Sequence, residues 1–209
     1  MADWATISAL ATAAGTLALA AATYASVRSA NRSARLAEVA LQEQRRPVLV
    51  SSRAADAIQS IGFADDHWYT VSGGGAVADA APEGVYLVVS LRNVGAGLAV
   101  MQGWHACQGD RYTEQAVPEV NEFRALTRDQ YIPPADIGVW QGAIRDPADP
   151  LRAALAGWIT ERRAFTLDLL YTDQIGGQRT ITRFGVLPGE DGWIAPVGLH
   201  WYLDSAAPR

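Results

Sequence analysis

The pattern of apolar and charged positions divides the chain into two parts, and the first is a long uncharged segment. Residues Trp4 to Val27 contain no charged side chain. A helix of this length extends about 36 Å, which is more than the roughly 30 Å hydrocarbon core of a bilayer. Trp4 and Tyr24 stand near its two ends, where aromatic side chains settle at membrane interfaces. We therefore predict a transmembrane helix in residues 1–27, with the lipid bilayer contacting residues 4–27.

Two alternatives for this segment are a cleaved signal peptide and a soluble amphipathic helix. A signal peptide carries basic residues before its apolar run, whereas only Asp3 precedes this one. Alanine fills ten of the 24 uncharged positions. Membrane insertion is therefore favoured by a modest margin, and a buried soluble helix stays an alternative.

Residues 28–46 form a basic segment, which we interpret as a helical stalk. Nothing in the sequence breaks a helix before Pro47, so the helix is predicted to run to Arg46. The basic residues of this segment outnumber its two glutamates; they are Arg28, Arg32, Arg35, Arg45 and Arg46. The positive-inside rule then predicts an external amino terminus and a cytoplasmic carboxy-terminal domain at the cell membrane. Arg28, Arg32 and Arg35 are expected to contact anionic lipid head groups.

Small residues recur every four positions in the uncharged helix, as at Ala11 and Gly15 and at Ala14, Ala18 and Ala22. This spacing lets membrane helices approach closely and favours self-association. It underlies one alternative function, a ligand-sensing membrane effector that oligomerises through its amino-terminal helix.

From Pro47 onward the apolar period changes to two, which is typical of β-strands. Alternation is clearest in Val85–Leu91 and Phe165–Tyr171. The other predicted strands are Val48–Ser52, Leu98–Ala106, Ile137–Ala143, Gln178–Val186 and one long strand over Trp193–Leu203. A Gly176–Gly177 turn joins two of them into a hairpin.

One short helix is predicted among the strands, where Asp149 supplies the cap, Pro150 the first turn, and Leu151, Leu155 and Trp158 one apolar face. Two insertions, 54–84 and 108–134, exceed ordinary hairpin loops, and the first is expected to be the least ordered part or to hide a strand. Seven to nine strands between turn signals predict a mainly β fold. We expect an antiparallel immunoglobulin-like sandwich over residues 47–209.

Composition and charge narrow the function classes. All 17 basic residues are arginine. A Walker A loop, a kinase ATP site and a lysine Schiff base are therefore excluded. Residues 54–209 carry 11 arginines against 19 acidic residues. Such an acidic domain is a poor candidate for nucleic-acid binding. The single Cys107 excludes an internal disulfide and agrees with a reducing compartment.

Candidate chemistry gathers around the three histidines. His105 and Cys107 are two apart on a predicted strand and share a face, which fits two metal ligands or a cysteine–histidine hydrolase pair. Asp65, Asp66 and His67 add ligand types from the first insertion. A zinc site needs three or four convergent ligands and the pattern gathers none. We therefore expect no metal, no cofactor and no catalytic residue, and the hydrolase using His105 and Cys107 is a second alternative function.

Four further residues are assigned from strand phase. Trp104, Trp193 and Trp201 share the phase of core positions and are expected to pack inside. Trp140 is out of phase with Ile137 and Val139, which makes it the best candidate for an exposed aromatic. Asp168 points outward on its strand and is expected to be a solvated edge charge.

Three turn motifs carry a resemblance at the level of the fold. Leu91–Leu98 contains an Asn-x-Gly element, Pro133–Gly138 reads Pro-Pro-Ala-Asp-Ile-Gly, and Tyr171–Gly177 forms a glycine hairpin. The Asn-x-Gly element resembles that of bacterial immunoglobulin-like adhesion modules. The whole layout resembles uncharacterised bacterial single-pass membrane proteins with a carboxy-terminal immunoglobulin-like sandwich. The resemblance implies a fold and no catalytic residues. The sequence thus favours a membrane-anchored, non-catalytic module that binds a protein partner or self-assembles.

Overall fold

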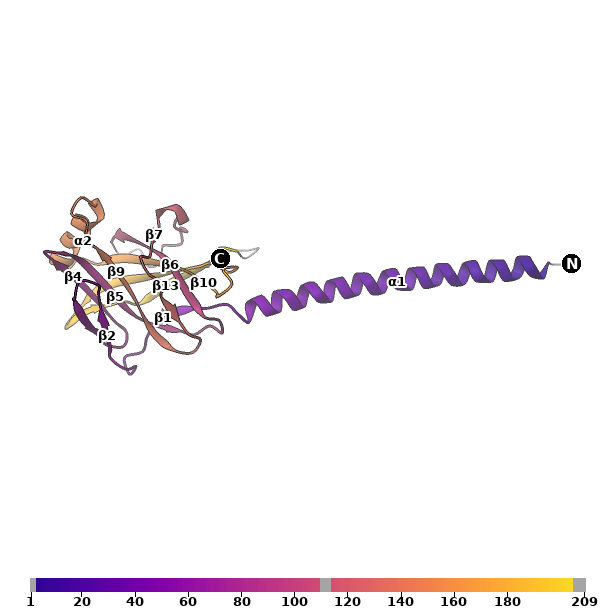
Figure 1. The fold of residues 1–209 in the computed structure, drawn as a ribbon, viewed down its shortest axis with the longest axis horizontal. Helices are drawn as coiled ribbons and strands as arrows, with labels where there is room; N and C mark the ends of the chain where they lie inside the picture. Colours follow the sequence, from indigo (N-terminus) through magenta and orange to yellow (C-terminus); the bar gives the residue numbers. More distant parts are fainter. Residues whose placement is uncertain (1–2, 110–113, 205–209) are drawn as a thin grey trace. The chain divides into compact units, whose positions relative to one another are not determined.

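The computed structural model describes residues 3–109 and 114–204 and divides into two compact units, Met1–Gln44 and Arg45–Arg209. The first unit is one continuous helix, α1 (Trp4–Glu43) (Figure 1). The side chain of Asp3 caps it by accepting a hydrogen bond from the Ala5 N–H at 3.4 Å. The prediction of a single long amino-terminal helix is confirmed.

The helix ends at Glu43, not at Arg46 as predicted. Pro47 disfavours a helical conformation at Arg46. Arg46 packs instead within the second unit, where its guanidinium carbon lies 4.2 Å from the ring centre of Tyr202. Its Nε–H donates to Gln178 Oε1 at 3.2 Å. The last residues of the predicted stalk therefore belong to the β domain.

The second unit contains thirteen strands within the described residues. They are β1 (Leu49–Ser51), β2 (Gln59–Gly62), β3 (Trp68–Val71), β4 (Gly75–Ala81), β5 (Gly84–Asn93), β6 (Ala99–Gln108), β7 (Arg124–Ala125), β8 (Tyr131–Ile132), β9 (Ile137–Ile144), β10 (Phe165–Thr172), β11 (Thr180–Gly189), β12 (Gly192–Ile194) and β13 (Val197–Tyr202). A 3₁₀ turn, η1 (Val120–Glu122), precedes β7. The predicted short helix is confirmed as α2 (Pro150–Thr160), capped by Asp149.

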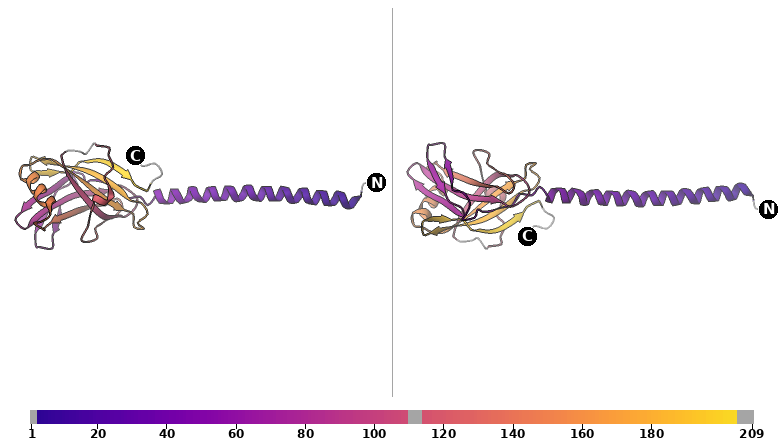
Figure 2. Two further views of the ribbon diagram at one scale, coloured as in Figure 1. Left: turned by 90° about the horizontal axis from the view of Figure 1, so that it is seen from above. Right: turned by 90° about the horizontal axis from the view of Figure 1, so that it is seen from below.

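Eleven of the strands form one antiparallel sheet that folds over into two layers through β11 (Figure 2). In one layer β5 pairs with β1 and β4 on one edge and with β9 on the other. In the second layer β10 lies between β6 and β11, and β13 follows β11. Residues 180–186 of β11 pair with β10, whereas residues 187–189 pair with β12 in the first layer.

The main core lies between the two layers. Val85, Leu87, Val89 and Leu91 of β5 are buried with Phe165, Leu167 and Leu169 of β10, as their alternation predicted. The helix α2 adds Leu155 and Trp158 to this core. Burying one face of each layer is the reason for the period of two. The predicted antiparallel sandwich is confirmed, and its immunoglobulin-like character stays a prediction.

The insertion 54–84 is ordered and contains three strands. The hairpin of β2 and β3 covers the outer face of β5, where Ile61, Phe63 and Val71 pack on Tyr86 and Val88. The strand β4 pairs with β5 over six residues. The expectation that this stretch is the least ordered part is therefore wrong, and the hidden strand exists.

The strand predicted over Trp193–Leu203 is two strands. Pro196 has no backbone N–H to donate and separates β12 from β13. β12 pairs with β4 in the first layer, whereas β13 pairs with β11 in the second. The insertion 108–134 holds η1, β7 and β8, and its residues 110–113 lie outside the described part.

Trp140 is fully buried, so its prediction as an exposed aromatic is wrong. The register pairs Trp140 with Val89, whose side chain faces the core. Val139 and Ala143 instead face outward and pack beneath the β2–β3 hairpin. Gly142 leaves room for the Trp140 ring, because a Cβ there would lie 2.8 Å from two ring atoms. The inward positions of β9 thus include Gly138 and Gly142, and the larger apolar side chain of Val139 on the outer face misled the phase argument.

Candidate functional site

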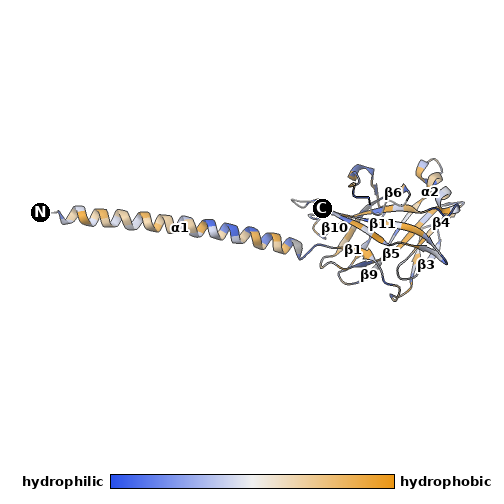
Figure 3. Cartoon of the chain, turned by 180° about the vertical axis from the view of Figure 1, so that it is seen from behind, coloured by the Kyte–Doolittle hydropathy of each residue, from blue (hydrophilic) through white to orange (hydrophobic). Residues whose placement is uncertain are grey.

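The most exposed apolar surface of the described chain is α1. Large apolar side chains along it are 47–83% exposed; they are Trp4, Ile7, Leu10, Leu17, Leu19, Tyr24, Val27, Leu36, Val39 and Leu41. It is long and apolar enough to cross a membrane. Figure 3 shows apolar colouring over its first half and a hydrophilic band in its second. An apolar surface of this extent in water is unfavourable, which makes α1 a candidate membrane site.

The structure places the three histidines apart. His67 lies on the turn of the β2–β3 hairpin, stacked on Tyr86 with ring centres 4.6 Å apart. His105 lies on the outer face of β6, and His200 on β13 approaches Thr182 Oγ1 at 2.8 Å through Nδ1. His105 and Cys107 share a face as predicted, since they oppose Asp168 and Thr166 of β10. The nearest charged neighbours of His105 are carboxylates, at 3.4 Å for Asp168 and 3.9 Å for Glu122.

A buried ion pair lies on this same outer face of the second layer. Asp168 points outward as expected, but it is fully buried and not a solvated edge charge. Arg183 holds both of its oxygens, with Nε–Oδ1 at 2.7 Å and Nη2–Oδ2 at 2.9 Å. The guanidinium also donates to the Glu114 carbonyl at 3.0 Å and lies 4.9 Å from the ring centre of Trp201. The buried carboxylate is thus paired with an arginine that the Glu114 backbone and the Trp201 ring also contact.

A second polar cluster lies beneath the β2–β3 hairpin. Arg145 Nε–H donates to Asp65 Oδ2 at 2.6 Å, and the Tyr86 hydroxyl donates to the same oxygen at 2.5 Å. The Arg145 guanidinium, and then the Tyr86 hydroxyl, hold the pKa of Asp65 well below its usual range. Burial, and then Asp65, raise the pKa of Tyr86 to about 12. Asp65 and His67 were expected to lie on a mobile loop; they are instead part of this ordered cluster.

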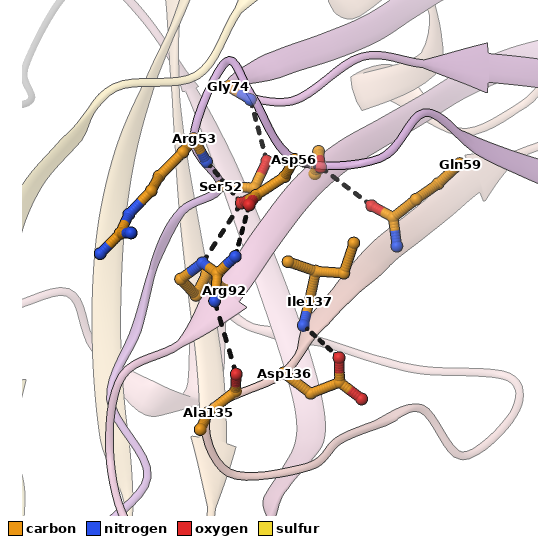
Figure 4. A network of polar contacts seen from close by, with 10 residues as sticks. Ser52, Arg53, Asp56, Gln59, Gly74, Arg92, Ala135, Asp136 and Ile137 are labelled. Atoms are coloured by element: carbon orange, nitrogen blue, oxygen red, sulfur yellow. Dashed lines mark hydrogen bonds and ion pairs between the residues drawn. The ribbon is translucent and has the colours of Figure 1, made fainter.

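A third polar network joins the segment after β1 to the end of β5 (Figure 4). Arg92 holds the Asp56 carboxylate, and Asp56 Oδ2 also accepts the Arg53 N–H at 2.7 Å. The Arg92 hydrogen bond is the main cause that lowers the pKa of Asp56. Ser52 Oγ lies 2.6 Å from Ser90 Oγ and accepts the Gly74 N–H at 2.9 Å. Each of these groups has a partner within the fold, so the network has a structural role.

The turn after β5 is organised by Asn93, which is fully buried. Its Nδ2 donates to the carbonyls of Gly97 at 2.7 Å and Ile132 at 3.0 Å. Its Oδ1 accepts the N–H groups of Gly95 at 3.0 Å and Val48 at 3.2 Å. The Asn-x-Gly motif therefore joins β1, β5 and β8, which is a structural and not a catalytic role.

The tryptophans predicted to be internal are buried: Trp104, Trp193 and Trp201 are 4, 8 and 2% exposed. Trp104 and Trp193 belong to the main core, whereas Trp201 packs with Leu170 and Ile181 on the outer face of the second layer. Among the tryptophans of the β domain, the exposed one is Trp68, at 71%. Its position in the insertion 54–84 kept it out of the strand-phase argument.

Sequence reasoning missed a groove between the free edge of β9 and the segment 124–132, which we call the edge groove. It contains a cavity of about 100 Å³. Its walls include Trp104, Leu126, Arg128, Gln130, Gln141 and Ala143. A shallower extension of the groove reaches Val139 and Tyr131. The signal for this groove was absent from the sequence because it depends on which edge of β9 remains unpaired.

The described residues contain no group of three or more histidine, cysteine, aspartate or glutamate side chains placed to hold a metal ion. Comparison of the chain with known protein families, curated proteins and solved structures gave no match.

Proposed function

We propose that this chain is a single-pass membrane protein. Its α1 helix and basic segment tether a non-catalytic, immunoglobulin-like β-sandwich to the cytoplasmic face of the membrane, where the sandwich binds a protein partner or self-assembles. The single observation that supports this proposal best is the exposure of α1. The side chains of Leu10, Leu17 and Leu19 are 67–72% exposed on a helix that is long and apolar enough to cross a membrane.

The orientation of the proposal rests on charge. Arg28, Arg32 and Arg35 follow the uncharged part of α1 directly, whereas Asp3 precedes it. Arginine-rich flanks stay on the cytoplasmic side, so the amino terminus would lie outside. At that place each arginine gains about 1 kcal/mol from anionic lipids.

The assignment of a binding role rests on the polar clusters of the domain. Asn93, Asp56 and Asp168 each have partners that hold strands or loops together. The cavity of the edge groove is about 100 Å³, which is well below the roughly 300–1,000 Å³ of a typical small-molecule site, and its shallow extension is open to solvent. A binding surface explains such an architecture better than a catalytic centre.

The anchoring is tested by extraction of cell membranes with alkaline carbonate. The full chain should stay in the membrane pellet, and a Leu10→Arg/Leu17→Arg variant should move to the soluble fraction, because charges at the bilayer centre oppose insertion. Glu161→Gln, an exposed change in the β domain, serves as the control. A wild-type chain released by carbonate would overturn the anchor.

The binding role is tested by crosslinking intact cells that express the full chain. We expect a discrete adduct or a dimer of higher mass. A chain that remains monomeric at every crosslinker concentration would contradict both partner binding and self-assembly.

A further inference from the structure

The edge groove borders a strand whose outer backbone groups are unpaired. In an antiparallel pair, alternate residues direct both N–H and C=O to the neighbouring strand, and the residues between them direct both groups away. Asn93 N–H donates to the Asp136 carbonyl at 3.0 Å, which fixes the even-numbered residues of β9 as those that face β5. The backbone N–H and C=O groups of the odd-numbered residues Val139, Gln141 and Ala143 therefore point to the free edge of β9.

The outward backbone groups of one of these three residues, Gln141, are already hydrogen-bonded to a side chain. Gln130 Nε2–H donates to the Gln141 carbonyl at 2.9 Å, and Gln130 Oε1 accepts the Gln141 N–H at 3.1 Å. The Gln130 amide thus makes the two hydrogen bonds that one residue of a neighbouring strand would make. The outward backbone N–H and C=O groups of Val139 and Ala143 have no hydrogen bond within residues 3–109 and 114–204. Unpaired edge groups of this kind are a template for another strand.

A second observation is an unsatisfied buried polar group at the same place. Gln141 is 8% exposed, and its Oε1 has no hydrogen-bond partner in the described part of the chain. Gln141 lies on the wall shared by the cavity and its shallow extension. A buried acceptor without a donor is unfavourable. The groove therefore lacks a donor that a bound segment can supply.

The charges on the rim indicate which segment fits. Arg128 is exposed, and Arg145 uses its Nε–H for Asp65. The Arg145 guanidinium also lies 5.6 Å from the ring centre of Tyr86, and Arg128 Nη2–H donates to the Gly62 carbonyl at 3.5 Å. Asp129 is the acidic residue of the shallow extension, and it raises the pKa of the neighbouring Tyr131 hydroxyl. A guanidinium has five N–H donors, so Arg128 and Arg145 keep further donors for a carboxylate at the rim.

We propose that the free edge of β9 binds an extended acidic segment of a partner protein. Its backbone would pair with Val139 and Ala143, an apolar side chain would enter the cavity beside Trp104, and a carboxylate would meet Arg128 and Arg145. This inference rests on the proposed function and names the partner chemistry for it. A second copy of the chain fits less well, because two-fold pairing of β9 edges brings the same arginines together.

The test uses the full chain in a nonionic detergent and measures fluorescence anisotropy of labelled hexapeptides. The probe is an amidated hexapeptide in which valine and glutamate alternate, and the matched probe has lysine in place of glutamate. We expect the glutamate probe to bind about tenfold more tightly than the lysine probe. Added salt should weaken its binding. Equal affinity of the two probes would overturn the proposal.

Two variants locate the site. Ala143→Pro removes one free-edge N–H and should weaken binding of the glutamate probe about tenfold, whereas Ala116→Pro on an exposed segment should not. Arg128→Gln should also weaken it, with Arg163→Gln as the charge-matched control. Circular dichroism checks that each variant folds. In the unsubstituted chain, the probe should slow hydrogen exchange of the Val139 and Ala143 amides, and unchanged exchange would overturn the proposal even where a variant fails to fold.

The peptide-binding test can fail or succeed independently of the tests of the proposed function. Peptide binding in detergent does not depend on anchoring or orientation, so failure of the carbonate test leaves this result intact. If crosslinking in cells captures the same adduct with Ala143→Pro as with the wild type, the edge is not the binding site and the binding role survives. A dimer that Ala143→Pro abolishes would replace the acidic segment by a second copy and overturn the inference.

Discussion

At the scale of single residues, Asn93 shows how one buried amide organises a whole corner of the domain. Both of its donor hydrogens and both lone pairs of its oxygen are used, and all four partners are backbone groups. These partners come from the segments around β1, the turn after β5 and β8. The side chain therefore replaces the backbone ladder where three segments meet and no regular pairing is available.

Replacing Asn93 by alanine should destabilise the domain strongly. Four backbone groups would lose their partner, and each buried unsatisfied group costs about 1–3 kcal/mol, partly relieved by entering water. We expect a loss of more than about 2 kcal/mol in the free energy of unfolding. Urea denaturation of the full chain in detergent, followed by tryptophan fluorescence, measures it. Asn121→Ala, at an exposed position, is the control, and equal midpoints for the two variants would contradict the role assigned to Asn93.

Asp65 makes the stability of the folded domain depend on pH. Its pKa is lowered mainly by Arg145, and the pKa values of Asp56, Asp149 and Asp204 are lowered mainly by Arg92, Arg124 and Arg179. A carboxylate with a lowered folded-state pKa stabilises the fold above its unfolded value, near 4, and loses this contribution as the pH falls through the folded value.

The domain should therefore unfold at a lower urea concentration at pH 3 than at pH 7. The Asp65→Asn variant should show a smaller difference between the two pH values, because one of the responsible carboxylates is gone. Urea midpoints at both pH values measure the effect. Asp191→Asn, on the exposed turn between β11 and β12, should retain the full difference. A pH response of Asp65→Asn as large as that of the wild type would show that Asp65 does not contribute.

At the scale of elements, the pairing of β10 with β11 places a buried ion pair on the outer face of the second layer. Asp168 lies directly opposite Arg183 in the register, and the Glu114 carbonyl accepts a further hydrogen bond from Arg183. Removing one partner of a buried pair leaves a charge without compensation. Asp168→Asn should therefore lower the free energy of unfolding by about 3–5 kcal/mol.

The double variant Asp168→Leu/Arg183→Leu separates this explanation from a simple loss of packing. With both charges gone, apolar side chains can fill the same face, so stability should recover in large part. Urea denaturation of the single and double variants forms the comparison. A double variant as unstable as the sum of two single variants would show that the charges themselves are not the cause.

The same elements show what a sequence can and cannot predict. β5 and β10 were predictable because one face of each lies on the main core, which imposes an alternation. β4 was not, because its sequence of alanine, valine and aspartate has few large side chains. β9 was assigned the wrong inner face because its inward positions include Gly138 and Gly142, whereas the apolar Val139 lies on the outer face. The Asp168–Arg183 pair could have been predicted from the sequence. The hairpin was predicted around Gly176–Gly177, and its register brings the two residues together.

At the scale of the whole molecule, opposite charges are separated along the chain. Residues 28–53 carry six arginines and two glutamates, whereas residues 54–209 carry an excess of eight acidic side chains. An anionic lipid surface attracts the first segment and repels the second, within about 8 Å at physiological salt. This arrangement would hold the basic segment at the head groups and leave the β domain free to meet a partner.

The arginines should also determine the orientation of the chain in the membrane. Replacing Arg28, Arg32 and Arg35 by glutamine and placing three arginines before Trp4 moves the positive flank to the other end of the uncharged helix. The positive-inside rule then predicts that the amino terminus stays in the cytoplasm and the β domain is translocated. A carboxy-terminal reporter that is active on one side of the membrane only measures the change. The wild type should report the cytoplasm and the variant the outside, whereas the glutamine substitutions alone should give a mixture of both. A reporter that gives the same side for all three chains would show that a feature other than the arginines sets the topology.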